Sequence, residues 1–272
     1  MRAAVRVMLC VAVACLIAGQ ALAQFPPITD PNRDEAKCQS GTATTLARLF
    51  ATRMKCVRAC IATGRKGGGF GGCFGPGFTD PATNTCIFNP LNGTEAKAKA
   101  GIIRACASDC PECYTAVDAN LCATGQPFVT DVASQVDAFA QQIYCVEAGG
   151  AVPSKSDAKC EDAVAKSLVR FVGAKTRCYQ TCTTNMRRGS IAPGSCDPPL
   201  PADPATYACI AAAEFGSHGA NFAIDKVCER SFDPAKNTRP ACYTMVTGTG
   251  EGWVPPVESY VDSRISISAC GG

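Results

Sequence analysis

The chain has 272 residues, of which 47% are hydrophobic and 18% charged, and its formal net charge is +3 at pH 7. A balance this close to neutral gives no indication of a nucleic-acid or anionic-membrane partner. The single histidine, His218, argues against zinc sites built from imidazole ligands, whereas the 20 cysteines make sulfur chemistry the main feature of the sequence.

Residues 1–23 have the pattern of a secretory signal peptide. Two arginines within the first six residues precede an apolar run at 7–18, which is too short to span a bilayer. The tripeptide Ala-Leu-Ala at 21–23 is a cleavage site of the small-x-small type, so we expect the mature chain to begin at Gln24. We therefore expect an exported protein, periplasmic or extracellular, with no transmembrane segment in its mature part.

Only Cys10 and Cys15 lie in the expected signal peptide, and 18 cysteines remain. Export, an even count and high density together point to disulfides formed in an oxidising compartment. All-cysteine metal sites would need thiolates that such a compartment oxidises, so we expect no metal and no cofactor. The cysteines expected in disulfides are Cys38, Cys56, Cys60, Cys73, Cys86, Cys106, Cys110, Cys113, Cys122, Cys145, Cys160, Cys178, Cys182, Cys196, Cys209, Cys228, Cys242 and Cys270.

The first predicted element of the mature chain is a helix over residues 34–63. Its apolar and cysteine positions recur near the helical period. A glycine-rich loop, "GRKGGGFGG", follows and contains the spacing G-x-G-x-x-G, but a phosphate-binding loop needs a strand before it and a helix after it. Phe70, Phe74 and Phe78 in and after this loop either form a contact surface or fold back over the core, and we favour the second interpretation.

Further helices are predicted at 94–108, 131–145, 219–230 and 256–269. The last of these ends in "VDSRISISAC", an alternation that is also compatible with a strand. Glycine- and proline-rich loops separate the helices.

The stretch "CASDCPEC" at 106–113 has two spacings with chemical meaning. Cys106, Cys110 and Cys113 have the C-x₃-C-x₂-C spacing of iron–sulfur sites in radical enzymes, and C-P-E-C has the C-x-x-C spacing of thiol–disulfide oxidoreductases. The first needs an alternating strand and helix pattern, and the second needs a strand before the motif. Because neither context is present, we predict structural cysteines.

The chain contains an internal repeat. At an offset of 122 residues, "DEAKCQSGTATTLARLFATRMKCVRAC" at 34–60 matches "SDAKCEDAVAKSLVRFVGAKTRCYQTC" at 156–182, and the strings D-P-A-T and P-x-C-Y-T recur farther along. Two units, residues 24–150 and 151–272, are therefore predicted, joined near "EAGGAVPSKS".

The repeat also predicts which cysteines pair. Cys110 and Cys122 have no counterparts in the second unit, and their joint absence predicts that they bond to each other. An antiparallel α-hairpin in each unit, with helical arms of matching length, predicts nested bonds. The remaining predicted pairs are Cys38–Cys106, Cys56–Cys86, Cys60–Cys73, Cys113–Cys145, Cys160–Cys228, Cys178–Cys209, Cys182–Cys196 and Cys242–Cys270. The predicted fold is thus mainly α: two tandem disulfide-linked α-hairpin-like repeats with long Gly/Pro-rich loops.

The recurring features are K-C, C-x-x-x-C, D-P-A-T-x-x-C-I, an Ala/Lys-rich helix ending in Cys, P-x-C-Y and a closing Cys, and they cover nearly all of residues 34–270. In these features each unit resembles a repeat found in uncharacterised exported Cys-rich helical-repeat proteins of environmental bacteria. The resemblance implies secretion and a helical, disulfide-linked fold, and it implies no particular reaction.

We expect an exported disulfide-rich structural or binding module whose partner is an unidentified protein or envelope ligand. The alternative is a secreted enzyme, most readily a carboxylate-dependent hydrolase using Asp109 with Glu112 or Glu161 with Asp162. Those acids lie on a cysteine turn and at a helix start, where solvated acids are expected. A nucleophile–histidine mechanism would depend on His218, and no nucleophile motif accompanies it. No catalytic residue is therefore predicted.

Overall fold

The structure is a computed structural model that describes residues 33–75, 77–229, 239–243 and 250–270. These residues are mainly helical, and no strand occurs among them. The predicted signal peptide lies outside the described residues. Within the described part of the chain, no helix combines the length and apolarity needed to cross a membrane.

The helices of the first half, in chain order, are α2 (Arg33–Thr63), the π-helix η1 (Gly64–Gly68), α3 (Pro81–Phe88), α4 (Thr94–Ala105), α5 (Glu112–Val117), α6 (Leu121–Thr124), α7 (Gln126–Ile143) and α8 (Cys145–Ala148). Those of the second half are α9 (Lys155–Arg187), α10 (Pro204–Phe215), α11 (Ala220–Cys228) and α12 (Gly250–Ala269). The helices predicted from periodicity are thus present, with α7 and α12 beginning several residues earlier than expected.

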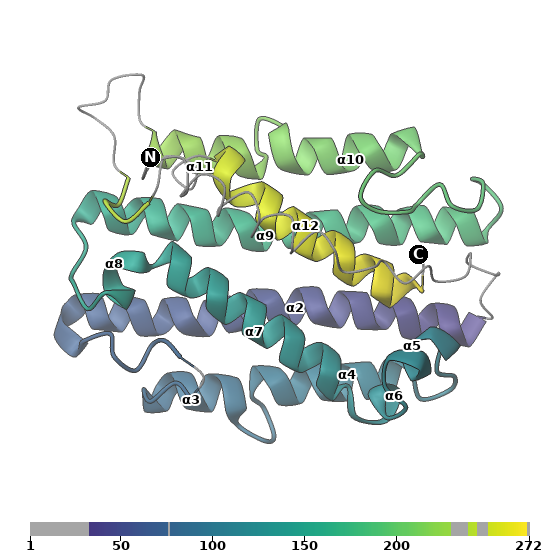
Figure 1. The fold of residues 1–272 in the computed structure, drawn as a ribbon, viewed down its shortest axis with the longest axis horizontal. Coiled ribbons are helices and arrows are strands. Elements are labelled where there is room, and N and C mark those ends of the chain that lie inside the picture. The colour runs from purple at the N-terminus through teal and green to yellow at the C-terminus, as the bar shows by residue number, and fades with distance from the viewer. Residues whose placement is uncertain (1–32, 76, 230–238, 244–249, 271–272) are drawn as a thin grey trace, which may run out of the picture.

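The two longest helices, α2 and α9, lie side by side at the centre of the molecule (Figure 1). They are antiparallel, because Arg187 at the end of α9 donates a hydrogen bond to Gln39 near the start of α2, while Arg65 just after α2 donates to Glu161 near the start of α9. α3 and α4 follow α2, α10 and α11 follow α9, and α7 and α12 run obliquely across the long pair (Figure 1).

Side-chain caps define where several helices begin. Ser154 and Asp157 form a reciprocal capping box at the start of α9. Asp80 and Asp203 each accept a hydrogen bond from the backbone N–H three residues later, with proline at the first helical position. The two D-P-A-T strings are therefore helix starts, and α3 and α10 form in segments that were expected to be loops.

The segment that packs along each long helix, expected as the second arm of a hairpin, is divided into two helices at a glycine. Gly93 begins α4 and Gly219 begins α11, and a Cβ atom at either position would come within 2.6 Å of backbone atoms. The broken arms still follow the long helices, so that Cys106 reaches Cys38 with their Cα atoms 4.3 Å apart.

Nine disulfides join the 18 cysteines that follow the expected signal peptide. Seven of the predicted pairs occur: Cys38–Cys106, Cys56–Cys86, Cys60–Cys73, Cys110–Cys122, Cys160–Cys228, Cys178–Cys209 and Cys182–Cys196. The two halves use nearly equal sequence separations for corresponding bonds: 68 and 68, 30 and 31, and 13 and 14.

The two remaining predicted pairs, Cys113–Cys145 and Cys242–Cys270, are wrong. Cys113 bonds to Cys270 and Cys145 bonds to Cys242, with Cα atoms 5.7 and 6.1 Å apart. The physical reason is the packing of the last helix, because α12 lies against α5, which carries Cys113, in the other half. Both bonds therefore connect the two halves.

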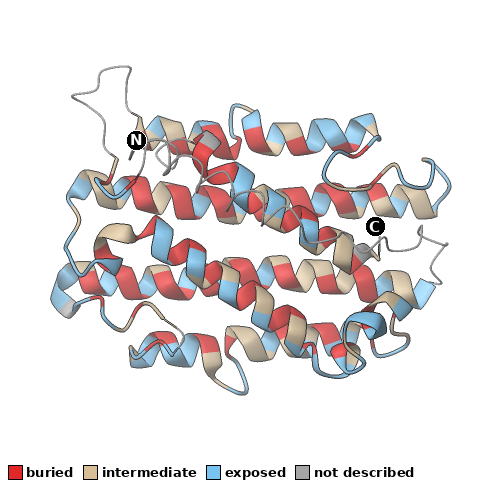
Figure 2. Ribbon diagram, viewed as in Figure 1, coloured by how far each residue is buried: buried red, intermediate tan, exposed pale blue. Residues whose placement is uncertain are grey.

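The buried residues of both halves form one continuous apolar cluster, which lies on the inward faces of the helices (Figure 2). In α12, Val254, Val257, Val261 and Ile265 are buried and recur at helical spacing, so the strand alternative for this segment is wrong. Burying a side chain of this size contributes about 1.5–3 kcal/mol.

Candidate functional site

Buried charged side chains of the described residues gather in three clusters, each built around one cation. The cations are Arg53 on α2, Lys175 on α9 and Arg65 on η1. Arg53 and Lys175 stand at matching positions of the two long helices, 122 residues apart. A cation at the same place in two otherwise apolar helix faces indicates a buried charge cluster, and the prediction from sequence missed it.

Arg53, which is 3% exposed, is bonded to two carboxylates. Its Nε and Nη2 donate to Asp137 over 2.7 and 2.6 Å, and its Nη1 donates to Glu95 over 2.7 Å. The guanidinium also lies over the rings of Phe78 and Phe88, 5.2 and 5.6 Å from their centroids. Burial acts to lower the pKa of Arg53, but the bonds to the two carboxylates outweigh it and raise that pKa above its usual value.

The Arg53 cluster forms one wall of an open pocket of about 450 Å³. One positive and two negative groups give the lining a net charge of −1, and Thr130, Ser134 and Gln141 add hydrogen-bonding side chains. The rest of the lining is Gly75, Phe88, Ala133 and Ala138. A pocket of this size and polarity suits a small polar molecule.

An apolar hollow between α2, α9 and α12 is much smaller, at about 30 Å³. Since one water molecule needs about 10–15 Å³ of such space, this hollow is far smaller than a typical ligand pocket.

Lys175 is fully buried and pairs with Glu258 over 2.6 Å and with Asp262 over 2.7 Å. Burial, followed by repulsion from Glu258, raises the pKa of Glu214 to about 7, although Lys175 opposes the rise. Burial also raises the pKa of Asp262, which accepts a hydrogen bond from the phenol of Tyr179. This cluster therefore changes its charge near neutral pH.

Arg65 binds three acids, two of which, Glu161 and Asp162, belong to the other half. It donates to Glu147 over 2.7 Å, to Glu161 over 2.9 Å and to Asp162 over 3.3 Å. The side chains of Glu147 and Glu161 are 0% exposed, and Oε2 of the first and Oε1 of the second have no hydrogen-bond partner within the described part of the chain. Burial, followed by the charge of Glu147, raises the pKa of Glu161 to about 9, so this pair of carboxyl groups holds a proton at neutral pH.

Of the two acid pairs considered from the sequence, one contains an acid that departs from the expectation of solvated side chains. Glu161 is buried against Arg65 rather than solvated at the start of its helix, so that expectation is wrong. Glu112 is exposed at the start of α5, beside half-buried Asp109. None of these acids lines the 450 Å³ pocket.

Other sequence candidates also take clear positions. His218 is exposed in the turn between α10 and α11. Phe70 and Phe78 are buried and Phe74 packs against the core, so the aromatic residues of the glycine-rich loop do fold back.

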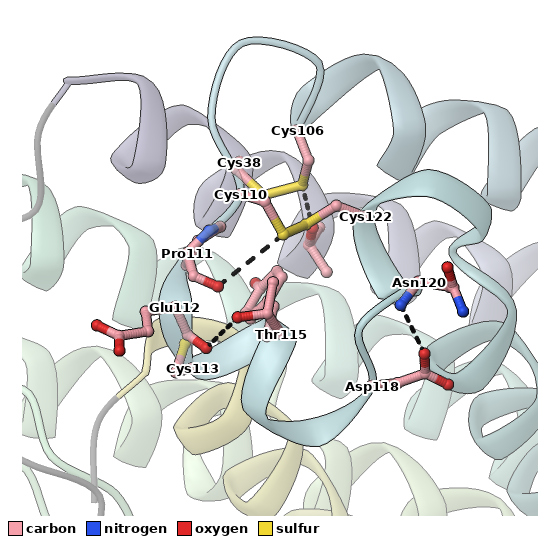
Figure 3. The surroundings of a disulfide bond; sticks show 12 residues. Cys38, Cys106, Cys110, Pro111, Glu112, Cys113, Thr115, Asp118, Asn120 and Cys122 are labelled. Carbon is pink, nitrogen blue, oxygen red and sulfur yellow. Dashed lines mark hydrogen bonds between the residues drawn. A yellow bond between two sulfur atoms is a disulfide. The ribbon is translucent and has the colours of Figure 1, made fainter.

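In the stretch "CASDCPEC", the two cysteines of C-P-E-C have different partners, and the Cys110–Cys122 bond lies beside Cys38–Cys106 (Figure 3). All the cysteines of this stretch are in disulfides, so they offer no thiolate ligands. The structural interpretation of the stretch therefore agrees with the geometry.

Comparison with protein-family profiles, with curated proteins and with solved structures finds no match to this chain. Its function has to be argued from the geometry of its own residues.

Proposed function

We propose that this chain is an exported, disulfide-rich binding protein and that the pocket beside Arg53 is its ligand site. The observation that carries the proposal is the pair of carboxylates, Glu95 and Asp137, held in place by one buried arginine on the wall of a 450 Å³ pocket. Groups fixed in this way need no reordering when a ligand arrives, which lowers the entropic cost of binding.

The ligand class that fits is a small organic cation, such as an aliphatic amine or a guanidine. The lining carries a net charge of −1, and Oε1 of Glu95 is the only one of its two oxygens that accepts from Arg53. Thr130, Ser134 and Gln141 can bond to the ligand's polar groups, and Phe88 offers an aromatic wall.

We also propose that the two halves arose by duplication and are related by an approximate twofold axis. The nearly equal disulfide separations support it, as do the matching pairs Arg53–Asp137 and Lys175–Asp262. In this account the second half retains the buried charge cluster while the first half also keeps an open pocket. The nine disulfides support secretion into an oxidising compartment.

The alternative, a carboxylate-dependent hydrolase, has less support. Such an enzyme needs two carboxyl groups facing a substrate, one of them with a raised pKa. The acids with the most clearly raised pKa values, Glu161 and Glu214, do not line the pocket.

Isothermal titration calorimetry at low ionic strength tests the binding proposal. The probes are putrescine and agmatine, with neutral 1,4-butanediol and anionic succinate as comparators. Only the two cations are expected to bind, and Glu95→Gln is expected to weaken them by roughly tenfold or more through loss of a charged hydrogen-bond acceptor.

The matched control is Glu258→Gln, which removes a carboxylate bonded to the buried cation Lys175 but lies outside the pocket. It is expected to leave cation binding unchanged. Equal binding of all four probes, no binding of the cations, or equal effects of the two variants would contradict the proposed site.

A further inference from the structure

Two disulfides of the first half lie close to each other. The Sγ atoms of Cys38, Cys106 and Cys122 all lie within 4.8 Å of one another, although Cys38–Cys106 is one bond and Cys110–Cys122 is another (Figure 3). No second group of three sulfur atoms this close occurs in the described ranges of the chain.

Helix packing fixes this arrangement. Cys106 is the C-cap residue of α4, and α6, which carries Cys122, packs back against α4. Leu121 and Ile102 are fully buried beside them, and Gly125, with a φ of 61°, lets the chain turn so closely that a Cβ there would be 3.2 Å from the Ile102 side chain. Cys122 is therefore held beside the inner bond.

The two bonds differ in access to solvent. Cys38 and Cys106 are 0% and 6% exposed, whereas Cys110 and Cys122 are half-buried. An external thiol therefore meets the outer bond, Cys110–Cys122, before the inner one. The buried hydroxyl of Thr42 lies 3.7 Å from Cys106 Sγ, where it can donate a hydrogen bond to a thiolate.

We propose that these four cysteines form a thiol–disulfide exchange site that passes reducing equivalents from an external dithiol to the inner bond. A thiolate of the dithiol attacks Cys110, and Cys122 leaves as a thiolate. The second thiol of the dithiol then attacks the mixed disulfide, which releases Cys110 as a thiol and the reductant as a disulfide. The Cys122 thiolate attacks Cys38, and Cys106 leaves as a thiolate beside Thr42.

The exchange balances in atoms and electrons. The dithiol loses two electrons and two protons, and the protein gains them as thiols on Cys106 and Cys110. The final step breaks one S–S bond and forms another, Cys38–Cys122, so it is not itself a reduction. Because that attack is intramolecular, it competes well with attack by a dilute external thiol.

The second half provides an internal control. Cys160–Cys228 corresponds to Cys38–Cys106, spans the same 68 residues and is likewise buried at both ends. It belongs to no group of three close sulfur atoms among the described residues. We therefore expect Cys38–Cys106 to undergo thiol–disulfide exchange and Cys160–Cys228 to resist it.

The first test uses the mature protein with dithiothreitol as the dithiol, rapid alkylation and peptide mapping over time. Cys110–Cys122 should open first, a Cys38–Cys122 linkage should follow, and Cys160–Cys228 should open at least about tenfold more slowly than Cys38–Cys106. If the two inner bonds open at the same rate with no Cys38–Cys122 peptide, the proposal is overturned.

The second test needs no reductant. Cys110→Ser leaves a thiol at Cys122, inside the group of three sulfur atoms, whereas Cys122→Ser leaves a thiol at Cys110, which is not in that group. Mapping should find a fraction of Cys38–Cys122 linkage in the first variant and intact Cys38–Cys106 in the second. Intact Cys38–Cys106 throughout both variants would also overturn the proposal, and if either variant fails to fold, the time course of the unaltered protein decides.

Discussion

Tyr114 donates a hydrogen bond from its phenol oxygen to the carbonyl oxygen of Ser268, which lies 2.7 Å away and 154 residues later in the chain. Tyr243 makes the matching bond to the carbonyl oxygen of Ile143, also over 2.7 Å. Each tyrosine follows the cysteine of a P-x-C-Y motif, and that cysteine is bonded to a cysteine just past the same opposite helix. Each half thus fixes the last long helix of the other through one disulfide and one buried hydrogen bond.

Removing the phenol of Tyr114 should destabilise the protein. Tyr114→Phe leaves the carbonyl of buried Ser268 without this donor, and such a loss costs about 1–3 kcal/mol. Tyr243→Phe should cost a similar amount. Guanidinium denaturation measures both, with Tyr207→Phe as the control because Tyr207 is 55% exposed. An effect no larger than that of the control would show that these bonds do not hold the halves together.

The stability contributed by Glu161 should fall as pH rises. Its folded-state pKa is about 9 against an ordinary value of 4.5, so between these values the folded protein binds one proton more than the unfolded chain. Unfolding free energy then decreases with pH across that window and levels off above it. Glu161→Gln removes this titration, so the variant should gain stability relative to the unaltered protein as pH increases.

Urea midpoints near the two ends of that pH window measure the effect. Glu112→Gln is the control, because Glu112 is exposed. A difference between the Glu161 variant and the unaltered protein that does not change with pH would rule out a shared proton between Glu147 and Glu161.

Replacing Lys175 should leave a cluster of uncompensated acids. Lys175→Met removes the cation that pairs with Glu258 and Asp262, and breaking a buried pair in this way costs about 3–5 kcal/mol. The loss should be smaller below pH 7 than above it, because Lys175 lowers the pKa of Glu214, which is about 7 in the unaltered protein. Without that cation the carboxyl keeps its proton to higher pH, and the variant loses stability when the proton leaves. Chemical denaturation on both sides of pH 7 is the measurement, with exposed Lys166→Met as the control. A loss that stays constant with pH would contradict this coupling.

The sequence predicted the local architecture because local spacing determines it. The long helices α2 and α9 follow from apolar periodicity, and six disulfides follow from the spacing of cysteines along antiparallel arms. The bond Cys110–Cys122 followed from the joint absence of its two counterparts in the second half.

The two disulfides that connect the halves could not be predicted in the same way. Cys113 and Cys145 recur at matching positions in the second half, as Cys242 and Cys270, so Cys113 has equivalent candidate partners in Cys145 and Cys270. Only the packing of α12 across the molecule distinguishes them. A similar reason applies to Glu161, which is buried by Arg65 from a segment 96 residues earlier, and nothing near Glu161 in the sequence indicates it.

The candidate pocket was missed for a related reason. Glu95 and Asp137 lie on α4 and α7, each of which could be predicted as a helix, but their convergence on Arg53 depends on how three helices pack. The matching positions of Arg53 and Lys175 were the one signal available, since a cation within an apolar helix face needs buried acids as partners.

The reciprocal connection of the two halves is tested most directly by cutting the chain between them. A protease site placed in the loop 149–154, where Val152 is 71% exposed, separates the halves, and Cys113–Cys270 and Cys145–Cys242 are the two bonds that cross the cut. Electrophoresis in sodium dodecyl sulfate should show one species of full mass without reductant and two fragments with it. Two separate fragments without reductant, as Cys113–Cys145 and Cys242–Cys270 pairing would give, would contradict this account of the fold.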